Sequence, residues 1–131
     1  MKNNYNILVI DDSLTTLLLI EWHLKEHGYN TMTAIDAEDA LRQTEYHVPN
    51  LIVLDLQLPG MSGFDFLKQV KFDREKMNIP VFVISALDSK ETIRRALLLG
   101  ANGFMTKPIN MKDLCEKIDN ILKFEVLKQG K

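Results

Sequence analysis

Ile7-Leu8-Val9-Ile10-Asp11-Asp12-Ser13 is the stretch that decides the fold, because an apolar run passes directly into two carboxylates. A short continuous apolar run is typical of a strand in a parallel sheet that is buried on both faces. We therefore predict that a buried strand ends at Ile10 and that Asp11 and Asp12 lie just beyond its carboxyl end. The acidic pair alone has a second explanation, since carboxylates also cap and stabilise helix N-termini.

The same pattern recurs along the chain. Short apolar or β-branched runs alternate with segments of helical periodicity, which indicates βα units around a parallel sheet. The predicted strands are residues 5–10, 29–34, 51–54, 81–84 and 103–105. Capping pairs mark helix starts, and Gly28 and Gly100 mark helix ends. The pairs are Asp36 with Asp39, Ser62 with Asp65, Asp88 with Glu91, and Asn110 with Asp113. We expect an α/β fold with a doubly wound, five-stranded parallel sheet.

Length and composition restrict the class of protein. A chain of 131 residues suits one domain. With 16 Lys and Arg against 18 Asp and Glu, the formal charge of −2 offers no basic surface for nucleic acid or an anionic membrane. No apolar run approaches the roughly 20 residues that span a bilayer. The lone Cys115 cannot form an internal disulfide. We expect a cytoplasmic protein with one domain over residues 1–127 and a C-terminal tail over 128–131.

Polar side chains follow four of the predicted strands. Asp11 and Asp12 come after the first, Asp55 after the third, Ser85 after the fourth and Lys107 after the fifth. We expect these groups to meet, because ligand sites in open α/β sheets lie outside the carboxyl ends of the strands. Three carboxylates repel one another unless a cation balances them, and oxygen ligands without His or Cys favour Mg²⁺ or Mn²⁺ over zinc. Asp55 is then a candidate phosphoryl acceptor, with Lys107 and Ser85 contacting the phosphoryl oxygens.

At these residues the chain resembles the receiver domain of bacterial two-component response regulators. The resemblance is carried by Asp11-Asp12, Leu54-Asp55-Leu56-Gln57-Leu58-Pro59-Gly60-Met61-Ser62-Gly63, Ser85-Ala86 and Lys107-Pro108. It spans nearly the whole chain. It implies the (βα)5 flavodoxin-like receiver fold with strand order 2-1-3-4-5. It also implies a signalling domain, rather than an enzyme, whose Asp55 is phosphorylated by a phosphohistidine on a sensor histidine kinase or histidine phosphotransfer protein.

The resemblance assigns the metal site residue by residue. It implies that Asp12 and Asp55 ligate Mg²⁺ directly, that Asp11 acts largely through water, and that the backbone carbonyl of Gln57 is a further ligand. Gln57 departs from the commonest family pattern, which has an apolar residue there. Its amide would either orient or obstruct an attacking water, so we predict an altered lifetime of the acyl phosphate.

The resemblance also assigns the switch and the output face. It implies that Ser85, where Thr is frequent, shifts toward the phosphoryl group, that Phe104 turns inward, and that the Lys107–Pro108 bond is cis. The fourth helix, fifth strand and fifth helix would contact a downstream effector or a second copy of the chain. Candidate contacts are Leu98, Leu99, Phe124, Val126 and Leu127. We expect either a stand-alone relay or the leading part of a longer regulator.

The first predicted helix carries two stripes. One comprises Thr16, Leu19, Ile20, His23, Leu24 and His27, and the other comprises Leu14, Leu17, Leu18 and Trp22. Taken with the family's geometry, the acidic pair turns the first stripe toward the sheet and leaves the second partly exposed. We expect Leu14, Leu18 and Trp22 to dock the helical phosphodonor. In the alternative, the second stripe is core and the histidines face water.

Other functions remain as alternatives. A haloacid-dehalogenase-type phosphatase also uses an aspartyl nucleophile, but Gln57 occupies the place of its acid/base Asp and an amide cannot exchange a proton in that role. A flavodoxin-like FMN carrier shares the sheet, but Asp11 and Asp12 would repel its phosphate. The stretch His23-Leu24-Lys25-Glu26-His27 fits a zinc-peptidase pattern without an obvious third ligand. A receiver-like interaction module that is never phosphorylated is the last alternative.

Overall fold

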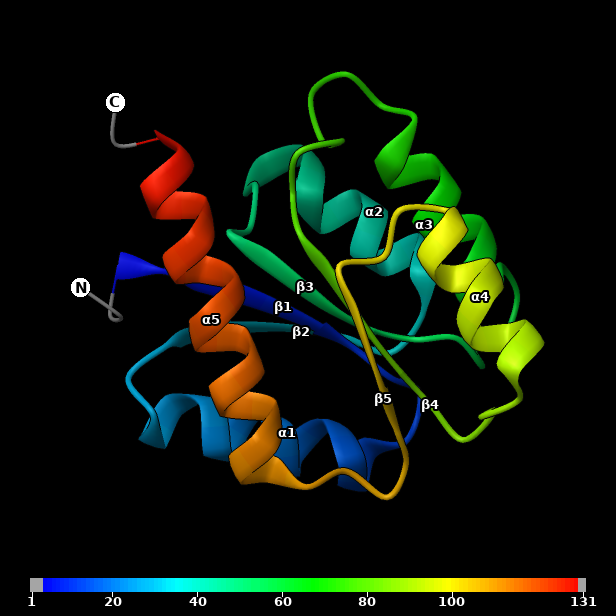
Figure 1. The fold of residues 1–131 in the computed structure, drawn as a ribbon, viewed down its shortest axis with the longest axis horizontal. Helices are drawn as coiled ribbons and strands as arrows, with labels where there is room; N and C mark the ends of the chain where they lie inside the picture. Colours follow the sequence, from blue (N-terminus) through cyan, green and yellow to red (C-terminus); the bar gives the residue numbers. More distant parts are fainter. Residues whose placement is uncertain (1–3, 130–131) are drawn as a thin grey trace.

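The computed structural model describes residues 4–129, with the backbone alone described over residues 124–129. Strands and helices alternate along this part of the chain (Figure 1). The strands are β1 (Asn6–Ile10), β2 (Asn30–Ala34), β3 (Leu51–Asp55), β4 (Val81–Ser85) and β5 (Gly103–Thr106). The helices are α1 (Leu14–Glu26), α2 (Ala37–Tyr46), α3 (Gly63–Lys71), α4 (Lys90–Leu98) and α5 (Met111–Gln129). None of the described helices is long and apolar enough to span a membrane.

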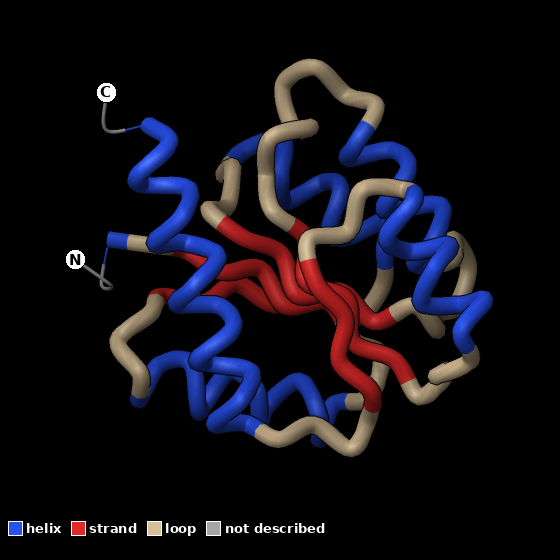
Figure 2. Tube along the Cα trace, viewed as in Figure 1, coloured by secondary structure: helices blue, strands red, loops and turns tan. Residues whose placement is uncertain are grey.

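The strands form one parallel sheet in the order β2-β1-β3-β4-β5, which confirms the predicted fold class and strand order. Helices cover both of its faces (Figure 2). In this order β3 lies between β1 and β4, and Ile10 pairs with Leu54 while Asp55 pairs with Ile84. Ser85 in turn pairs with Thr106, the residue before Lys107. The sheet therefore brings the polar ends of four strands to one edge.

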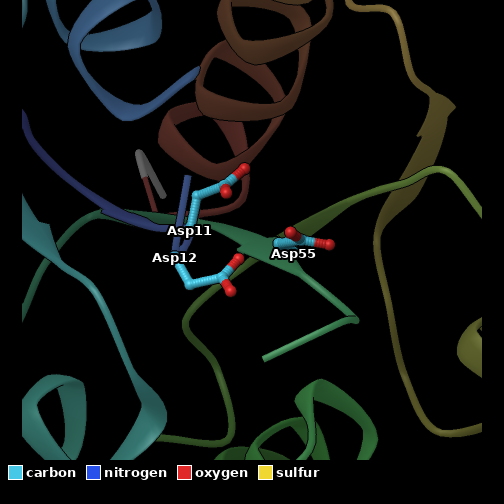
Figure 3. A group of neighbouring side chains, drawn as sticks. All are labelled: Asp11, Asp12 and Asp55. Atoms are coloured by element: carbon cyan, nitrogen blue, oxygen red, sulfur yellow. The ribbon is translucent and has the colours of Figure 1, made fainter. Parts of the chain in front are cut away.

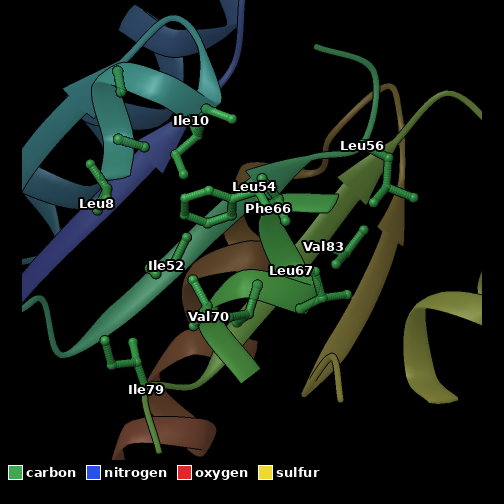
Figure 4. Packing of buried hydrophobic residues seen from close by; sticks show 14 of the residues in the cluster. Leu8, Ile10, Ile52, Leu54, Leu56, Phe66, Leu67, Val70, Ile79 and Val83 are labelled. Carbon is green, nitrogen blue, oxygen red and sulfur yellow. The ribbon is translucent and has the colours of Figure 1, made fainter. Parts of the chain in front are cut away.

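Two apolar cores lie on opposite faces of the sheet. On one face α2, α3 and α4 pack against alternate strand residues, among them Leu8, Ile52 and Leu54 (Figure 4). On the other face α1 and α5 pack against the intervening residues, such as Ile7 and Val53. Successive strand side chains point to opposite faces, so a strand covered on both sides must be apolar at every position. This explains the continuous apolar runs in the sequence.

Most of the predicted helix boundaries are confirmed. Asp36, Ser62 and Asn110 accept hydrogen bonds from the backbone N–H three residues later. The prediction for α4 was wrong by one residue, because Ser89 is the cap and accepts from the N–H of Thr92 at 3.1 Å. Asp88 lies one residue outside, where its carboxylate is exposed. A serine hydroxyl is as good a cap as a carboxylate, so adjacent Asp and Ser leave the start ambiguous from sequence.

The orientation of α1 was predicted only in part. Leu14, Leu18 and Trp22 are 61%, 52% and 59% exposed, as expected. However, Leu17 is buried and Leu19 is exposed, the reverse of their predicted placement. Neighbouring helix residues are separated by about 100°, so Leu17 and Leu19 are about 200° apart and cannot both face the sheet. The buried face comprises Leu17, Ile20 and Leu24.

The predicted contact residues of α4 differ in their exposure to solvent. Leu98 is 75% exposed, whereas Leu99 packs against the core beneath α4. Phe124, Val126 and Leu127 lie outside the part of the chain whose side chains are described. Of the two residues of this set whose side chains are described, Leu98 is therefore the exposed one.

Candidate functional site

The three predicted carboxylates converge at the carboxyl edge of the sheet. Asp11 and Asp12 leave the end of β1, and Asp55 ends β3 beside it (Figure 3). One oxygen from each carboxylate lies within 4.8 Å of the others. Asp11 and Asp55 are buried, whereas Asp12 is exposed. The cluster is therefore open to solvent on one side and closed on the other.

Lys107 reaches this cluster from the loop after β5. Its Nζ lies 2.9 Å from Asp11 Oδ2 and 3.0 Å from Asp55 Oδ2. We call Asp11, Asp12, Asp55 and Lys107 the acidic site. When all four groups are ionised, three negative charges face a single positive one, so the site carries an excess of negative charge.

Backbone groups fix the two buried carboxylates. The N–H of Ser13 donates to Asp11 Oδ1 at 2.8 Å, and the N–H of Gln57 donates to Asp55 Oδ1 at 3.0 Å. Each is a local turn in which an Asp side chain bonds the backbone two residues later. Within the described residues, the buried Asp11 Oδ2 has the ammonium of Lys107 as its single polar contact. An incompletely satisfied buried oxygen beside two other carboxylates fits a divalent cation that takes oxygen ligands.

The environment shifts the pKa values of two groups at this site. Burial raises the pKa of Asp55, and the charge of Asp11 adds to this, while hydrogen bonds from Gln57 and Lys107 oppose it. Burial alone would lower the pKa of Lys107, but hydrogen bonds and charge interactions with Asp11 and Asp55 outweigh that effect and raise it. The raised pKa of Lys107 reflects the negative charge of Asp11 and Asp55, whereas the raised pKa of Asp55 reflects chiefly its burial.

The other predicted residues lie on β4, on β5 and in the loops that follow β3 and β5. Ser85 is buried at the end of β4, and its Oγ accepts a hydrogen bond from the N–H of Leu87 at 3.0 Å. Phe104 lies on the adjacent β5 and is half-buried against the core beneath α2, α3 and α4. The Lys107–Pro108 peptide bond is cis, as expected. Gln57 is exposed at the start of the loop after β3.

No third ligand in the part of the chain that the structure describes completes a zinc site with His23 and His27. His23 Nδ1 lies 2.8 Å from the carbonyl oxygen of Leu19 in its own helix. His27 Nε2 lies 2.8 Å from Asp119 Oδ2 on α5, and the hydroxyl of Tyr29 donates to the other oxygen of Asp119. We call His27, Tyr29 and Asp119 the Asp119 cluster. Among the described residues, the potential ligands that lie close enough together to hold a metal ion are Asp11, Asp12 and Asp55.

One contact near the site was not anticipated. Glu38 in the first turn of α2 accepts a hydrogen bond at 3.3 Å from the N–H of Met61, in the loop that follows Asp55. An acidic residue in the first turn of a helix is usually explained by the helix dipole, so the sequence contained no signal for this contact. Glu38 and Met61 are 23 residues apart along the chain, so no local pattern indicates that they are in contact.

Comparison with known proteins identifies the family. Residues 7–119 match the model of the response regulator receiver domain, and the chain belongs to this family. It is therefore a signalling domain of two-component systems, as the resemblance implied. This assignment favours a receiver over a flavodoxin-like carrier or a phosphatase.

Individual relatives agree with the assignment. The chain is 35% identical over 120 residues to the alkaline phosphatase synthesis transcriptional regulatory protein PhoP of Bacillus subtilis, covering 92% of this chain and 49% of PhoP. It thus spans about half the length of that relative. It is 34% identical over 122 residues to the chemotaxis protein CheY-3 of Vibrio cholerae, covering 92% of this chain and 94% of CheY-3. A CheY-like receiver domain structure from Methanospirillum hungatei matches with a TM-score of 0.88 and 27% identity, covering 95% of this chain and 98% of its own.

Proposed function

We propose that Asp55 accepts a phosphoryl group from a phosphohistidine of a sensor histidine kinase or a phosphotransfer protein. The observation that carries this proposal is the excess of negative charge around a buried Asp55 whose carboxylate is held by Lys107. Such a site suits a metal-assisted phosphoryl transfer, in which positioning and charge neutralisation supply most of the catalysis. The receiver domain would occupy residues 1–127 and act in the cytoplasm.

The residues present fit a Mg²⁺ ion, with Mn²⁺ as a substitute. Asp12 and Asp55 would ligate it directly and Asp11 largely through water, with the backbone carbonyl of Gln57 as a further ligand. Oxygen-only donors and a partly unsatisfied buried carboxylate support this assignment. When bound, the ion would neutralise charge on the carboxylates and on the phosphoryl oxygens.

The side chains of the site then have separate tasks. An Asp55 oxygen forms the new bond to phosphorus while the bond from phosphorus to the histidine nitrogen breaks, and the histidine keeps that electron pair. Lys107 exchanges its contact with the Asp55 carboxylate for one with a phosphoryl oxygen. The Ser85 hydroxyl donates a hydrogen bond to another phosphoryl oxygen, which requires it to move toward Asp55.

We propose that this movement biases two states of α4 and β5. Ala96 is the fully buried residue of α4, so few apolar contacts anchor this helix to the sheet. Elements with few buried contacts are the ones that shift most easily. Movement of Ser85 would let Phe104 turn inward and change the α4-β5-α5 face, on which Leu98 is exposed. The readout would be an effector protein or domain, or a second copy of the chain.

The exposed face of α1 is proposed as the docking site of the phosphodonor. Leu14, Leu18 and Trp22 are exposed together on this helix, and the helix begins directly after the acidic site. Leu18→Asp should slow phosphotransfer from the kinase by about tenfold, since it places a charge in an apolar contact. Phosphorylation by acetyl phosphate should be unchanged. Equal loss with both donors would indicate misfolding and contradict the docking role.

The proposed chemistry is tested by amide NMR shifts on adding Mg²⁺ and then beryllium fluoride, a phosphoryl mimic. We expect Mg²⁺ to shift amides near Asp12, Asp55 and Gln57. Beryllium fluoride should then shift those near Ser85 and Lys107 and extend the change to Phe104. A spectrum unchanged by both additions would instead support an interaction module that is never phosphorylated.

A further inference from the structure

The loop between β3 and α3, residues 56–62, contains the carbonyl that the proposed function assigns to the metal. Its start is held by the hydrogen bond from the N–H of Gln57 to Asp55 Oδ1. Its ends are joined by a hydrogen bond of 3.0 Å from the N–H of Gly63 to the carbonyl of Leu56. A side chain at Gly63 has no space, because a Cβ there would lie 2.5 Å from the backbone of Asp55 and Leu56. These contacts fix both ends of the loop but do not reach its middle.

Glu38 on α2 contacts that middle. Its Oε2 accepts the hydrogen bond from the N–H of Met61 at 3.3 Å. The same carboxylate lies against Gly60, where an added Cβ would be 3.2 Å from Oε2 and 3.5 Å from Oε1. Gly60 has a φ of +72°, a conformation that glycine adopts without steric cost. The chain thus turns at Gly60 with its backbone packed directly on the Glu38 carboxylate.

A role in the helix dipole alone does not require these contacts. A carboxylate in the first turn stabilises a helix whichever way it points, because the effect depends on its distance from the N-terminus. Two other carboxylates, Asp36 and Asp39, already occupy this end of α2, and Asp36 accepts the capping hydrogen bond. The Glu38 side chain is instead directed at the backbone of a different segment.

The geometry points to Glu38 as a positioning residue for the metal site. Its carboxylate accepts the hydrogen bond from Met61 beside the turn at Gly60, and through this contact it adds to the restraint on the loop that contains the Gln57 carbonyl. Glu38 is not one of the clustered potential ligands, so it acts through the loop. A loop that is ordered before the metal binds loses less conformational entropy on binding. This inference rests on the proposed function, which makes Gln57 a ligand.

The test compares Glu38→Ala with Glu38→Gln, which removes the charge but keeps an oxygen acceptor. Glu75→Ala is the matched control, because Glu75 is an exposed carboxylate in the loop after α3. Mg²⁺ affinity is measured by calorimetry, and hydrogen exchange of the Met61 and Gln57 amides is measured in metal-free protein. We expect Glu38→Ala to weaken Mg²⁺ binding about threefold and to accelerate exchange at both amides. Glu38→Gln and Glu75→Ala should both remain close to the wild type.

The outcomes separate the possible explanations. Equal weakening of Mg²⁺ binding by Glu38→Gln and Glu38→Ala would assign the effect to charge and overturn the positioning role. Unchanged affinity and exchange in Glu38→Ala would overturn it as well. A wild-type protein that binds no Mg²⁺ would contradict the proposed function, while hydrogen exchange would still test whether Glu38 restrains the loop.

Discussion

The acidic site and the Asp119 cluster both join segments that are far apart in the sequence, but they balance charge differently. In the acidic site three carboxylates share one lysine, Lys107. In the Asp119 cluster one carboxylate is bound by both His27 and Tyr29. Burial and the neighbouring Asp119 raise the pKa of Tyr29, which keeps its hydroxyl protonated as a donor. A satisfied carboxylate suits a structural connection between α1, β2 and α5, whereas unbalanced carboxylates suit the binding of a cation.

The largest effect on stability is expected from removing the positive charge of Lys107, which partly neutralises the three carboxylates. Lys107→Met removes the ammonium but retains most of the aliphatic chain. The free energy of unfolding in EDTA should fall by about 3 kcal/mol, because buried carboxylates lose their charged partner. Added Mg²⁺ should recover more stability in this variant than in the wild type. Chemical denaturation with and without Mg²⁺ measures both effects, and an equal Mg²⁺ response in the two proteins would contradict the charge argument.

Asp119→Asn is the corresponding change in the Asp119 cluster. It should lower the free energy of unfolding by about 2 kcal/mol, since His27 and Tyr29 lose an ionised acceptor. Mg²⁺ affinity and phosphorylation should be unaffected, because His27, Tyr29 and Asp119 are not among the clustered carboxylates of the acidic site. Tyr29→Phe is the control that removes one hydrogen bond, with a smaller loss of about 1 kcal/mol. A change in Mg²⁺ affinity in Asp119→Asn would show that the two regions are coupled.

The pH dependence of stability reports the burial of Asp55. Because burial raises the pKa of Asp55, the folded protein holds this proton more tightly than the unfolded chain. The contribution of Asp55 to stability therefore falls as the pH rises from the unfolded value of about 4 through the higher folded value. Asp55→Asn removes this dependence and should be more stable than the metal-free wild type at neutral pH. If the difference in free energy of unfolding between Asp55→Asn and the metal-free wild type instead shrank with rising pH, folding would lower the pKa of Asp55 and the argument from burial would be wrong.

The smallest effect is expected at Gln57, which is exposed beside the acidic site. Its amide would either orient or obstruct the water that attacks the acyl phosphate. Gln57→Met should therefore change the rate of autodephosphorylation by about threefold, slowing it if the amide orients the water and speeding it if the amide obstructs the water, with Asp119→Asn as an unaffected control. Loss of the phosphorylated form over time, followed by intact mass, provides the rates. Identical rates for Gln57→Met and the wild type would remove this role.

Much of the fold and the acidic site was predictable because short-range patterns determine them. Continuous apolar runs identify strands that are buried on both faces, and the topology of a parallel sheet sends their carboxyl ends to one edge. Asp11, Asp55, Ser85 and Lys107 could be grouped from this rule alone. The structure places each of them at that edge.

The remaining features depend on tertiary contacts. Both Leu17 and Leu19 are apolar, so only the packing of α1 on the sheet decides that Leu17 is buried. His27 lies at the C-terminus of α1, but its partner Asp119 is 92 residues away. The contact of Glu38 with the loop after β3 likewise depends on how α2 packs. Such pairs have no periodicity or spacing that a single sequence can reveal.

Incubation with acetyl phosphate and Mg²⁺ tests the central claim most directly. Intact mass should show one added phosphoryl group on the wild type, lost in EDTA and absent from Asp55→Asn, while Asp119→Asn gains it normally. An unchanged wild-type mass, together with no Mg²⁺ bound in equilibrium dialysis, would contradict the proposal that the acidic site transfers a phosphoryl group to Asp55.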